Sequence, residues 1–304
     1  MNKVTVGVVG LGGIARKAHL PVLTAHPGVE IVALCSRTGE QVAELASQYR
    51  LQLQARTFPE LLALRPQAAY LLSPTALHPE QAVSLLEAGV AVYLEKPLAN
   101  DLAEARRIVA AAGQPGRLLM VGFNRRYAPA YRRVRALFAG RRMEFIQIHK
   151  HRERGSKGWP LRQIIMDDTI HIIDLARFYA GELTVQVAHA RLGLVAAQLL
   201  APDGTLVQLS QSFGAGRPME RLEVHGDGLS VIVEGMERLT VVEGGVERAE
   251  PIGQSWTATL EKRGMASATD HFLHCLRTGV QPETDGAEAL RTQELAEAIL
   301  PAGS

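Results

Sequence analysis

The sequence predicts an α/β fold in which a doubly wound parallel sheet precedes a second, α+β domain with a largely antiparallel open sheet. Short apolar runs alternate with amphipathic helical stretches up to residue 122. Beyond about residue 142 the chain consists mostly of strand-like runs. Because 304 residues exceed one small core, two domains are expected, over 1–123 and 124–304.

The apolar runs of the first part have the character of buried parallel strands. They are "VTVGVVG" (4–10), "VEIVALCS" (29–36), "AAYLLS" (68–73), "GVAVYLE" (89–95) and "RLLMVGF" (117–123). Amphipathic stretches separate them, notably at 40–49, 79–89 and 102–113. Continuous apolar strands alternating with helices indicate a parallel sheet covered on both faces, and right-handed crossovers make it doubly wound.

The second part predicts a meander. Its strand-like runs are 143–152, 183–192, 205–213, 220–226, 229–235 and 238–244. One clear helix, 166–181, interrupts them, and glycine-containing turns such as "APDGT" connect them. Two helices, 265–278 and 285–299, close the chain, and the last is a candidate to pack back on the first domain.

Composition narrows the class of partner. The formal net charge is only +2, without the basic footprint of a nucleic-acid-binding protein, so we expect a small-molecule substrate. The two cysteines, Cys35 and Cys275, form no disulfide framework, which fits a reducing cytoplasm. No run approaches the roughly 18 apolar residues of a membrane span, and we expect no membrane association.

A glycine-rich turn follows the first strand and has the G-x-G-x-x-A pattern. It comprises Gly10, Gly12, Gly13, Ile14 and Ala15, with a helical pattern after it. Such glycines allow a tight turn and close backbone approach to a pyrophosphate at a helix N-terminus. Glycines also serve plain strand–helix turns, but this position after the first strand favours dinucleotide binding.

The end of the second strand bears on the choice of nucleotide. It reads Ser36, Arg37 and Thr38, with no acidic residue to bind a ribose 2′-hydroxyl. An arginine flanked by hydroxyls suits a 2′-phosphate, so we expect NADP, with NAD as the alternative. The competing interpretation is a solvent-exposed arginine at a strand–helix turn.

Two further strand ends should line the same edge of the sheet. One carries Pro74, Thr75 and His78, and the other carries Glu95 and Lys96 before a proline. Proline restricts the residue before it, so the lysine is expected to point off the strand end towards cofactor and substrate. Its charge would stabilise alkoxide character at a substrate oxygen. A surface ion pair between the glutamate and the lysine is the alternative.

In the helix of the second part, Asp167, His171 and Asp174 fall at positions i, i+4 and i+7, hence on one face. Histidine is the usual proton carrier at neutral pH, and a carboxylate can orient it. A capped helix start with a core histidine is the competing interpretation.

Other polar residues are candidates for contacts with an anionic or polar substrate. They are Arg125, Lys150, Arg152 and Trp159. A solvated face explains the basic ones equally. His149, His151 and Glu153 alternate onto one strand face, but edge polarity explains them, and we predict no metal site.

These motifs together resemble the glucose–fructose oxidoreductase, inositol dehydrogenase and rhizopine-catabolism (Gfo/Idh/MocA) family, in particular its MviM-like bacterial oxidoreductases. The resemblance rests on "GLGGIA", "EKP", "VGFNRRYAP", the DxxxHxxD pattern and the closing "DGAEALRTQELAEAIL", and covers essentially the whole chain. It implies a Rossmann domain followed by an open sheet used for homodimer or tetramer formation. It also implies Lys96 as the catalytic lysine, with Asp167 and His171 as its partners.

Two residues depart from the family pattern. Thr169 stands where the family usually has a small residue, often glycine, and its hydroxyl is expected to narrow the space near the nicotinamide. Asp168 competes with Asp167 for the role of functional acid.

The sequence thus predicts an NAD(P)-dependent oxidoreductase acting on a hydroxyl or carbonyl carbon of a sugar-like or polyol compound. His171 would act as acid and base, Lys96 would polarise the oxygen, and Asp167 and Asp174 would orient and balance charge. A lyase or glycosidase that recycles a bound nicotinamide is the second interpretation, and a non-catalytic nucleotide sensor is the third.

Overall fold

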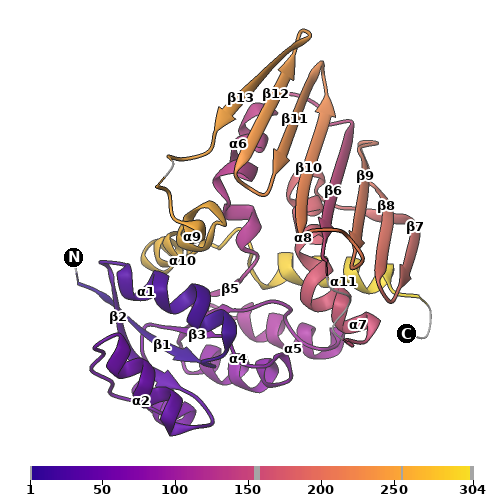
Figure 1. Cartoon of the computed structure of the whole chain (residues 1–304). Coiled ribbons are helices and arrows are strands. Elements are labelled where there is room, and N and C mark those ends of the chain that lie inside the picture. The colour runs from indigo at the N-terminus through magenta and orange to yellow at the C-terminus, as the bar shows by residue number, and fades with distance from the viewer. Residues whose placement is uncertain (1, 154–157, 255, 302–304) are drawn as a thin grey trace. The chain divides into compact units, whose positions relative to one another are not determined.

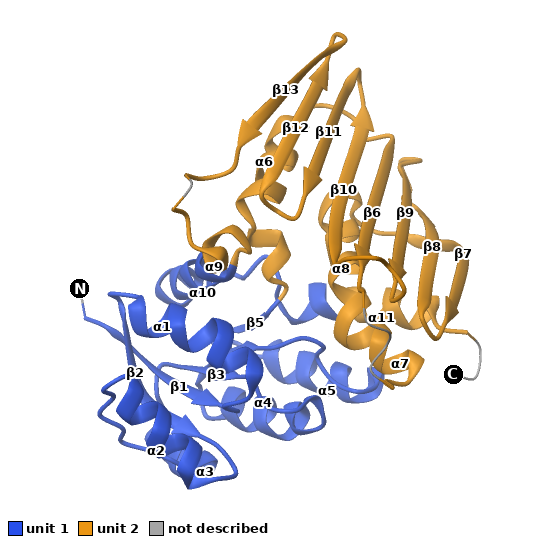
Figure 2. Ribbon diagram, in the orientation of Figure 1, with its two compact units in different colours: residues 1–122, 265–290 blue, residues 123–264, 291–304 orange. Residues whose placement is uncertain are grey.

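The computed structural model describes residues 2–153, 158–254 and 256–301. The chain divides into two compact units (Figure 2), of which the first comprises 1–122 and 265–290 and the second 123–264 and 291–304. The second unit therefore differs from the expected domain 124–304 chiefly in that residues 265–290 belong to the first unit.

The first unit contains the predicted parallel sheet (Figure 1). Its strands are β1 (Val4–Val9), β2 (Val29–Cys35), β3 (Ala68–Leu71), β4 (Ala91–Leu94) and β5 (Leu119–Val121). They pair in parallel in the order β2-β1-β3-β4-β5. The order reverses direction at β1, so a crevice is expected at the carboxyl ends of β1 and β3.

Helices cover this sheet. They are α1 (Leu20–Ala25), α2 (Gly39–Gln48), α3 (Phe58–Leu64), α4 (His78–Glu87), α5 (Leu102–Ala112) and α10 (Met265–Thr278). Helix α3 is absent from the sequence prediction because it is short and follows a polar loop. Its start carries a capping box, in which Thr57 and Glu60 satisfy each other's backbone N–H groups.

An aromatic cluster shows why α10, distant in sequence, belongs to the first unit. Tyr70 of β3 and Tyr93 of β4 stack with ring centroids 4.5 Å apart. Phe272 of α10 meets both rings edge-on, at 5.6 Å and 5.7 Å. Such pairs add to the free energy gained from burial, so this cluster ties the helix to the two central strands.

The second unit is built on a mostly antiparallel sheet of eight strands. They are β6 (Phe145–His151), β7 (Thr184–Arg191), β8 (Leu194–Leu200), β9 (Leu206–Ser212), β10 (Met219–Gly226), β11 (Leu229–Glu234), β12 (Arg238–Glu243) and β13 (Val246–Pro251). Their order is β13-β12-β11-β10-β6-β9-β8-β7. Within it β6 and β9 pair in parallel and the other neighbours pair antiparallel.

Two of these strands were not predicted. The segment of β8 contains adjacent alanines, which carry little strand propensity, and β13 is a charged, exposed edge strand. The prediction overlooked β8 although its sequence, LVAAQLL, is largely apolar, whereas β13, VERAEP, has no apolar run.

The second unit also contains helices, two of which pack on its sheet. They are α6 (Pro129–Leu137), α7 (Leu161–Ile164), α8 (Ile170–Ala180) and α9 (Thr259–Lys262), and α11 (Gly286–Ile299) begins in the first unit and ends in the second. Helix α8 packs on β6 and β9, and α6 on β11. In β6, β8 and β9 buried residues alternate with half-exposed ones, which leaves the opposite sheet face partly open. Among the described helices, none is both long and apolar enough to span a bilayer.

Candidate active site

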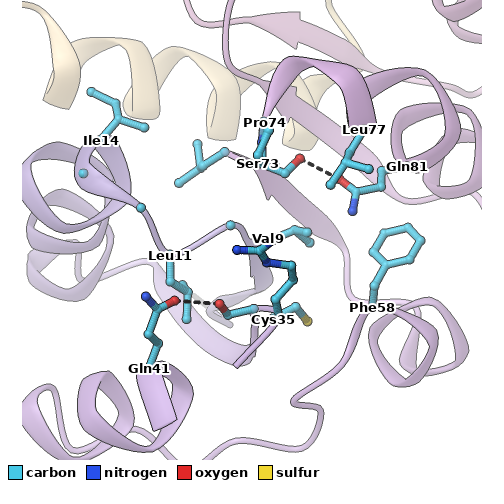
Figure 3. A pocket seen from close by; sticks show the side chains of 16 residues that line it. Val9, Leu11, Ile14, Cys35, Gln41, Phe58, Ser73, Pro74, Leu77 and Gln81 are labelled. Atoms are coloured by element: carbon cyan, nitrogen blue, oxygen red, sulfur yellow. Dashed lines mark hydrogen bonds between the residues drawn. The ribbon is translucent and has the colours of Figure 1, made fainter. Parts of the chain in front are cut away.

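A cavity of about 610 Å³ opens in the first unit beside the carboxyl ends of β1, β2 and β3 (Figure 3). Its lining is mainly apolar, with a few polar side chains. The lining residues are Val9, Gly10, Leu11, Gly12, Gly13, Ile14, Cys35, Ser36, Arg37, Gln41, Phe58, Leu72, Ser73, Pro74, Leu77 and Gln81. This is the crevice at which open α/β sheets bind their ligands.

The glycines of the turn serve two different purposes. Gly10 has φ +90°, and a Cβ there would stand 2.5 Å from the backbone of Leu72 and Ser73, so the fold itself requires glycine. At Gly12 and Gly13 a Cβ would meet no protein atom within 4 Å. Glycine at these two positions leaves open space beside the cavity, as close approach of a pyrophosphate demands, and the residues fit a dinucleotide.

Substituting these glycines should separate folding from binding. Gly12→Ala is expected to leave the melting temperature nearly unchanged and to weaken NAD(P) binding about tenfold to a hundredfold, because the methyl group occupies ligand space. Gly10→Ala, the matched control, is expected to destabilise the fold by about 1–3 kcal/mol. Calorimetric titration and thermal unfolding measure both effects. Equal affinity in Gly12→Ala and the wild type would contradict this role.

Two hydroxyl–amide pairs furnish the cavity with neutral polar groups (Figure 3). The Ser36 hydroxyl donates to Gln41 Oε1 at 2.7 Å, and the Ser73 hydroxyl donates to Gln81 Oε1 at 2.6 Å. Burial raises the pKa of the Cys35 thiol to about 12, so it stays protonated and is no nucleophile. The lining is therefore suited to binding a ligand, and the Cys35 thiol within it does not act as a nucleophile.

The predicted cofactor residues divide into two groups. Gly10, Gly12, Gly13, Ile14, Ser36, Arg37 and Pro74 line the cavity. Ala15, Thr38, Thr75, His78, Glu95 and Lys96 are not among its lining residues. The sequence prediction did not include Gln41, Phe58 and Gln81. They lie on α2, α3 and α4, and these helices lie beside the cavity only because of the order of the strands in the sheet.

Glu95 forms an internal pair instead of lining the cavity. His19 Nε2 lies 2.8 Å from Glu95 Oε1, and the Lys96 N–H donates to Glu95 Oε2 at 3.3 Å. Burial opposes ionisation of Glu95, but the hydrogen bond and charge of His19 together with those of Lys96 outweigh it and lower the pKa of the carboxyl. His19 ends a π-helical turn, Ala15–His19, that directly follows the glycine turn. The pair therefore ties the segment of Lys96 to the segment that follows the cofactor loop.

His78 has a similar structural role. Its Nδ1 lies 3.0 Å from the Pro97 carbonyl oxygen and its Nε2 lies 3.0 Å from the Ser73 carbonyl oxygen. Burial lowers the pKa of this histidine, which favours the neutral ring. His78 thus joins the loop after β3 to the loop that follows Lys96. The peptide bond between Lys96 and Pro97 in that loop is cis.

In the second unit, the predicted acid–histidine–acid face is not continuous. Residues Ile165–Thr169 form a π-helical turn before α8, so the regular helical spacing does not hold across it. Asp167 and His171 are partly exposed, whereas Asp174 is buried, with 1% of its side chain exposed. The turn changes the spacing between Asp167 and His171, whereas His171 and Asp174 both lie in α8 and differ in burial.

Asp174 is committed to an internal ion pair. Arg126 donates to its carboxylate through Nε at 2.8 Å and Nη2 at 2.7 Å, and the Thr292 hydroxyl donates at 3.1 Å. These contacts lie within the second unit and are largely desolvated. The contacts support a structural role for Asp174, and its predicted part in catalysis stays a prediction.

The basic substrate candidates also have internal partners. Arg125 forms a two-pronged pair with Glu220 at 2.6 Å and 2.8 Å, while Lys150 and Arg152 both bind Asp168. Burial opposes ionisation of Glu220, but Arg125 outweighs it and lowers the pKa of this carboxyl to about 2. All three cations are thus paired with carboxylates of the second unit, and their role towards an anionic substrate stays a prediction. Trp159 is half-buried in the segment between β6 and α7.

The two aspartates of the wide turn differ sharply. Asp168 accepts hydrogen bonds from both Lys150 and Arg152, whereas the Asp167 carboxylate accepts one from Gln163 at 3.2 Å. An acid held by two cations is a poor proton acceptor. Asp167 is therefore the better candidate for the functional acid.

Thr169 corrects a further expectation. Its side chain is buried within the second unit, and its hydroxyl donates to Gln211 Oε1 at 2.6 Å. The hydroxyl therefore points into the interior towards β9, and the predicted narrowing beside the nicotinamide is wrong.

In the part of the chain that the structure describes, no group of three His, Cys, Asp or Glu side chains is arranged to hold a metal ion.

Comparison with known proteins agrees with this architecture. Residues 4–123 match the family described as "Oxidoreductase family, NAD-binding Rossmann fold" (Gfo/Idh/MocA). The chain is 32% identical over 305 residues to YceM of Salmonella typhimurium, named as an oxidoreductase, covering 98% of both chains. It is 29% identical over 324 residues to a D-apiose dehydrogenase of Paraburkholderia graminis, covering 96% of this chain and 85% of the relative.

A solved structure extends the likeness to three dimensions. The dehydrogenase MviM from Clostridium difficile superposes with a TM-score of 0.91 at 27% identity, covering 97% of this chain and 98% of the other. At this coverage the match spans both units. The chain therefore belongs to the Gfo/Idh/MocA family of NAD(P)-binding oxidoreductases.

Proposed function

We propose that this oxidoreductase transfers a hydride between NAD(P) and a hydroxyl or carbonyl carbon of a sugar-like or polyol substrate. The observation that carries the proposal is the dinucleotide-sized cavity of about 610 Å³ at the carboxyl ends of β1, β2 and β3. The strand beside β3, β4, is followed directly by Glu95 and Lys96. A relative named for D-apiose supports the substrate class.

In the proposed reaction, the bound nicotinamide accepts or returns the hydride, and side chains of this chain manage the proton and the charge. The Lys96 ammonium donates a hydrogen bond to the reacting oxygen and stabilises its negative charge. An imidazole nitrogen of His171 takes the hydroxyl proton during oxidation and returns it during reduction. The Asp167 carboxylate orients the imidazole and balances its charge when it is protonated.

The experiment that tests this function is a nucleotide titration followed by a substrate screen. NADPH and NADH are titrated first, and the better-bound nucleotide is then used with a panel of polyols and aldoses that begins with myo-inositol and D-apiose. We expect net nicotinamide oxidation or reduction with one class of compound. Turnover without net nicotinamide change would indicate the lyase or glycosidase alternative. Nucleotide binding without any turnover would favour the sensor.

We further propose a preference for NADP. Ser36 and Arg37 line the cavity after β2, and that strand end carries no carboxylate to repel a phosphate. Arg37→Ala is expected to weaken NADPH binding about tenfold to a hundredfold, the value of a charge-assisted hydrogen bond, and to change NADH binding less than about twofold. Arg106→Ala on α5 is the control. A wild-type preference for NADH would contradict the assignment.

We also propose that copies of the chain associate through the partly open face of the eight-stranded sheet, as a homodimer or tetramer. Alternating half-exposed residues along β6, β8 and β9 support this surface. Sedimentation of the purified protein tests it, and a monomer would contradict it. A cytoplasmic setting is supported by the two free thiols, Cys35 and Cys275.

A further inference from the structure

The side chain of Asp168 is held from several directions at the centre of the π-helical turn. Its Oδ1 accepts hydrogen bonds from Lys150 Nζ at 2.6 Å and Arg152 Nη2 at 2.7 Å. Its Oδ2 accepts from Gln211 Nε2 at 2.6 Å and Arg152 Nε at 3.1 Å. Lys150 Nζ also donates to the backbone carbonyl of Asp168 at 2.6 Å. Side chains from β6, from the residue after it and from β9 thus bind one residue of the turn.

Gln211 extends this attachment to the next residue. Its Nε2 binds Asp168, and its Oε1 accepts the Thr169 hydroxyl at 2.6 Å. Gln211 is completely buried, and Thr169 is 1% exposed. Both polar groups of one buried amide are therefore used on two successive residues of the turn.

The alternation of buried and half-exposed residues along β6 and β9 places two polar side chains where the turn is attached. On the inner face of β6, Ile146 and Ile148 are followed by Lys150, and on β9 Val207 and Leu209 are followed by Gln211. The two strands are parallel neighbours, with His149 opposite Ser210. Their apolar stripes thus change to polar residues at the same level, which is the level at which the π-helical turn crosses them.

The electrostatics favour a fixed carboxylate. Burial opposes ionisation of Asp168, but Arg152 and Lys150 outweigh it and hold the pKa of this carboxyl far below its usual range. Burial and the neighbouring Arg125 lower the pKa of Lys150 to about 7. Desolvating such charges is costly, and a buried ion pair contributes little net stability, so stability alone does not account for the cluster.

We propose that Asp168 is a positioning residue, and that its contacts with Lys150, Arg152 and Gln211 hold the π-helical turn so that Asp167 and His171 keep the geometry needed for proton transfer. Isolated π-helical turns are rare, occur often at functional sites and need tertiary support. Asp168 directly follows Asp167 and lies three residues before His171, which is in the first turn of α8. The inference rests on the proposed function of those two residues.

The test compares Asp168→Asn with the wild type and with Asp227→Asn, a control whose carboxylate accepts an N–H in a surface turn of the same unit. Hydrogen–deuterium exchange of the free protein is measured over residues 161–180. We expect exchange at 165–171 to rise at least about tenfold in Asp168→Asn, because a charged anchor is lost, and to stay unchanged in the control. Unchanged exchange at 165–171 in the folded variant would overturn the inference.

Kinetics with the substrate found in the screen distinguish positioning from general destabilisation. We expect kcat of Asp168→Asn to fall about tenfold to a hundredfold after correction for the folded fraction, with KM and nucleotide Kd within about twofold, since small misplacement is costly in rate. The kcat–pH profile should move to lower pH, because removing a nearby negative charge disfavours the protonated proton carrier. A loss of kcat fully explained by unfolding would count against positioning.

Three further variants keep the inference separate from the proposed function. Gln211→Met removes one anchor while the charge cluster stays, and is expected to raise exchange at 165–171 about threefold even if Asp168→Asn fails to fold. If His171→Ala and Lys96→Ala retain full turnover, the proposed function fails. If they lose it while both anchor variants behave as wild type, the positioning role alone fails.

Discussion

Replacing Lys96 by alanine is expected to lower kcat about a thousandfold while nucleotide affinity changes less than about threefold. The ammonium group is the proposed source of charge stabilisation at the reacting oxygen, and loss of one such donor costs about a hundredfold to a thousandfold. Nucleotide binding should persist because Lys96 is not among the residues that line the cofactor cavity. Steady-state kinetics and calorimetric titration measure the two effects.

Two variants sharpen the interpretation. Lys3→Ala removes an exposed lysine from the same unit and should leave both quantities unchanged. Lys96→Arg keeps the charge but replaces a compact ammonium by a planar guanidinium, so partial activity is expected. Wild-type turnover in Lys96→Ala would remove the lysine from the mechanism. A large loss of nucleotide affinity would instead assign it to cofactor binding.

The parts of the fold that depend on local pattern were predictable from the sequence. The five parallel strands are apolar runs of the expected length, and the glycine turn follows the first of them. Gly10 is fixed by a backbone conformation that few other residues adopt, and such constraints leave a clear signal. The charged edge strand β13 left no such signal, and β8 was missed although its sequence is largely apolar.

The parts that depend on pairing across the chain were not predictable. Arg125 and Glu220 are 95 residues apart, and Arg126 and Asp174 are 48 apart, so nothing local indicates that these charges neutralise each other. Each arginine therefore looked available to a substrate in the sequence. The same reason hides Gln81, which reaches the cofactor cavity only because β3 lies beside β1.

The helix of the second unit illustrates a different limit. Regular helical spacing assigns Asp167, His171 and Asp174 to one face, but the turn at 165–169 is wider than an α-helical turn. No propensity rule predicts such a turn, because its support comes from side chains on β6 and β9. The histidine and the first aspartate keep their candidacy, and the second aspartate becomes part of the interior.

That reassignment predicts a large loss of stability in Asp174→Ala, about 3–5 kcal/mol, because it leaves the buried Arg126 guanidinium without its carboxylate partner. The side chains of Arg126 and Asp174 are only 5% and 1% exposed, so water cannot replace the lost contact. Denaturant unfolding measures the effect. Glu237→Ala, which removes an exposed ion pair with Lys262 at 3.8 Å, is the control and should cost less than about 1 kcal/mol.

A double variant separates a structural role from a catalytic one. Asp174→Leu combined with Arg126→Met replaces the ion pair by apolar side chains of similar size and should recover much of the lost stability, since a desolvated pair contributes little net free energy. If Asp174 is structural, the refolded double variant should regain turnover in proportion to its folded fraction. If it carries a proton or orients His171, turnover should stay low although the fold is restored, and the acid–histidine–acid assignment would then stand.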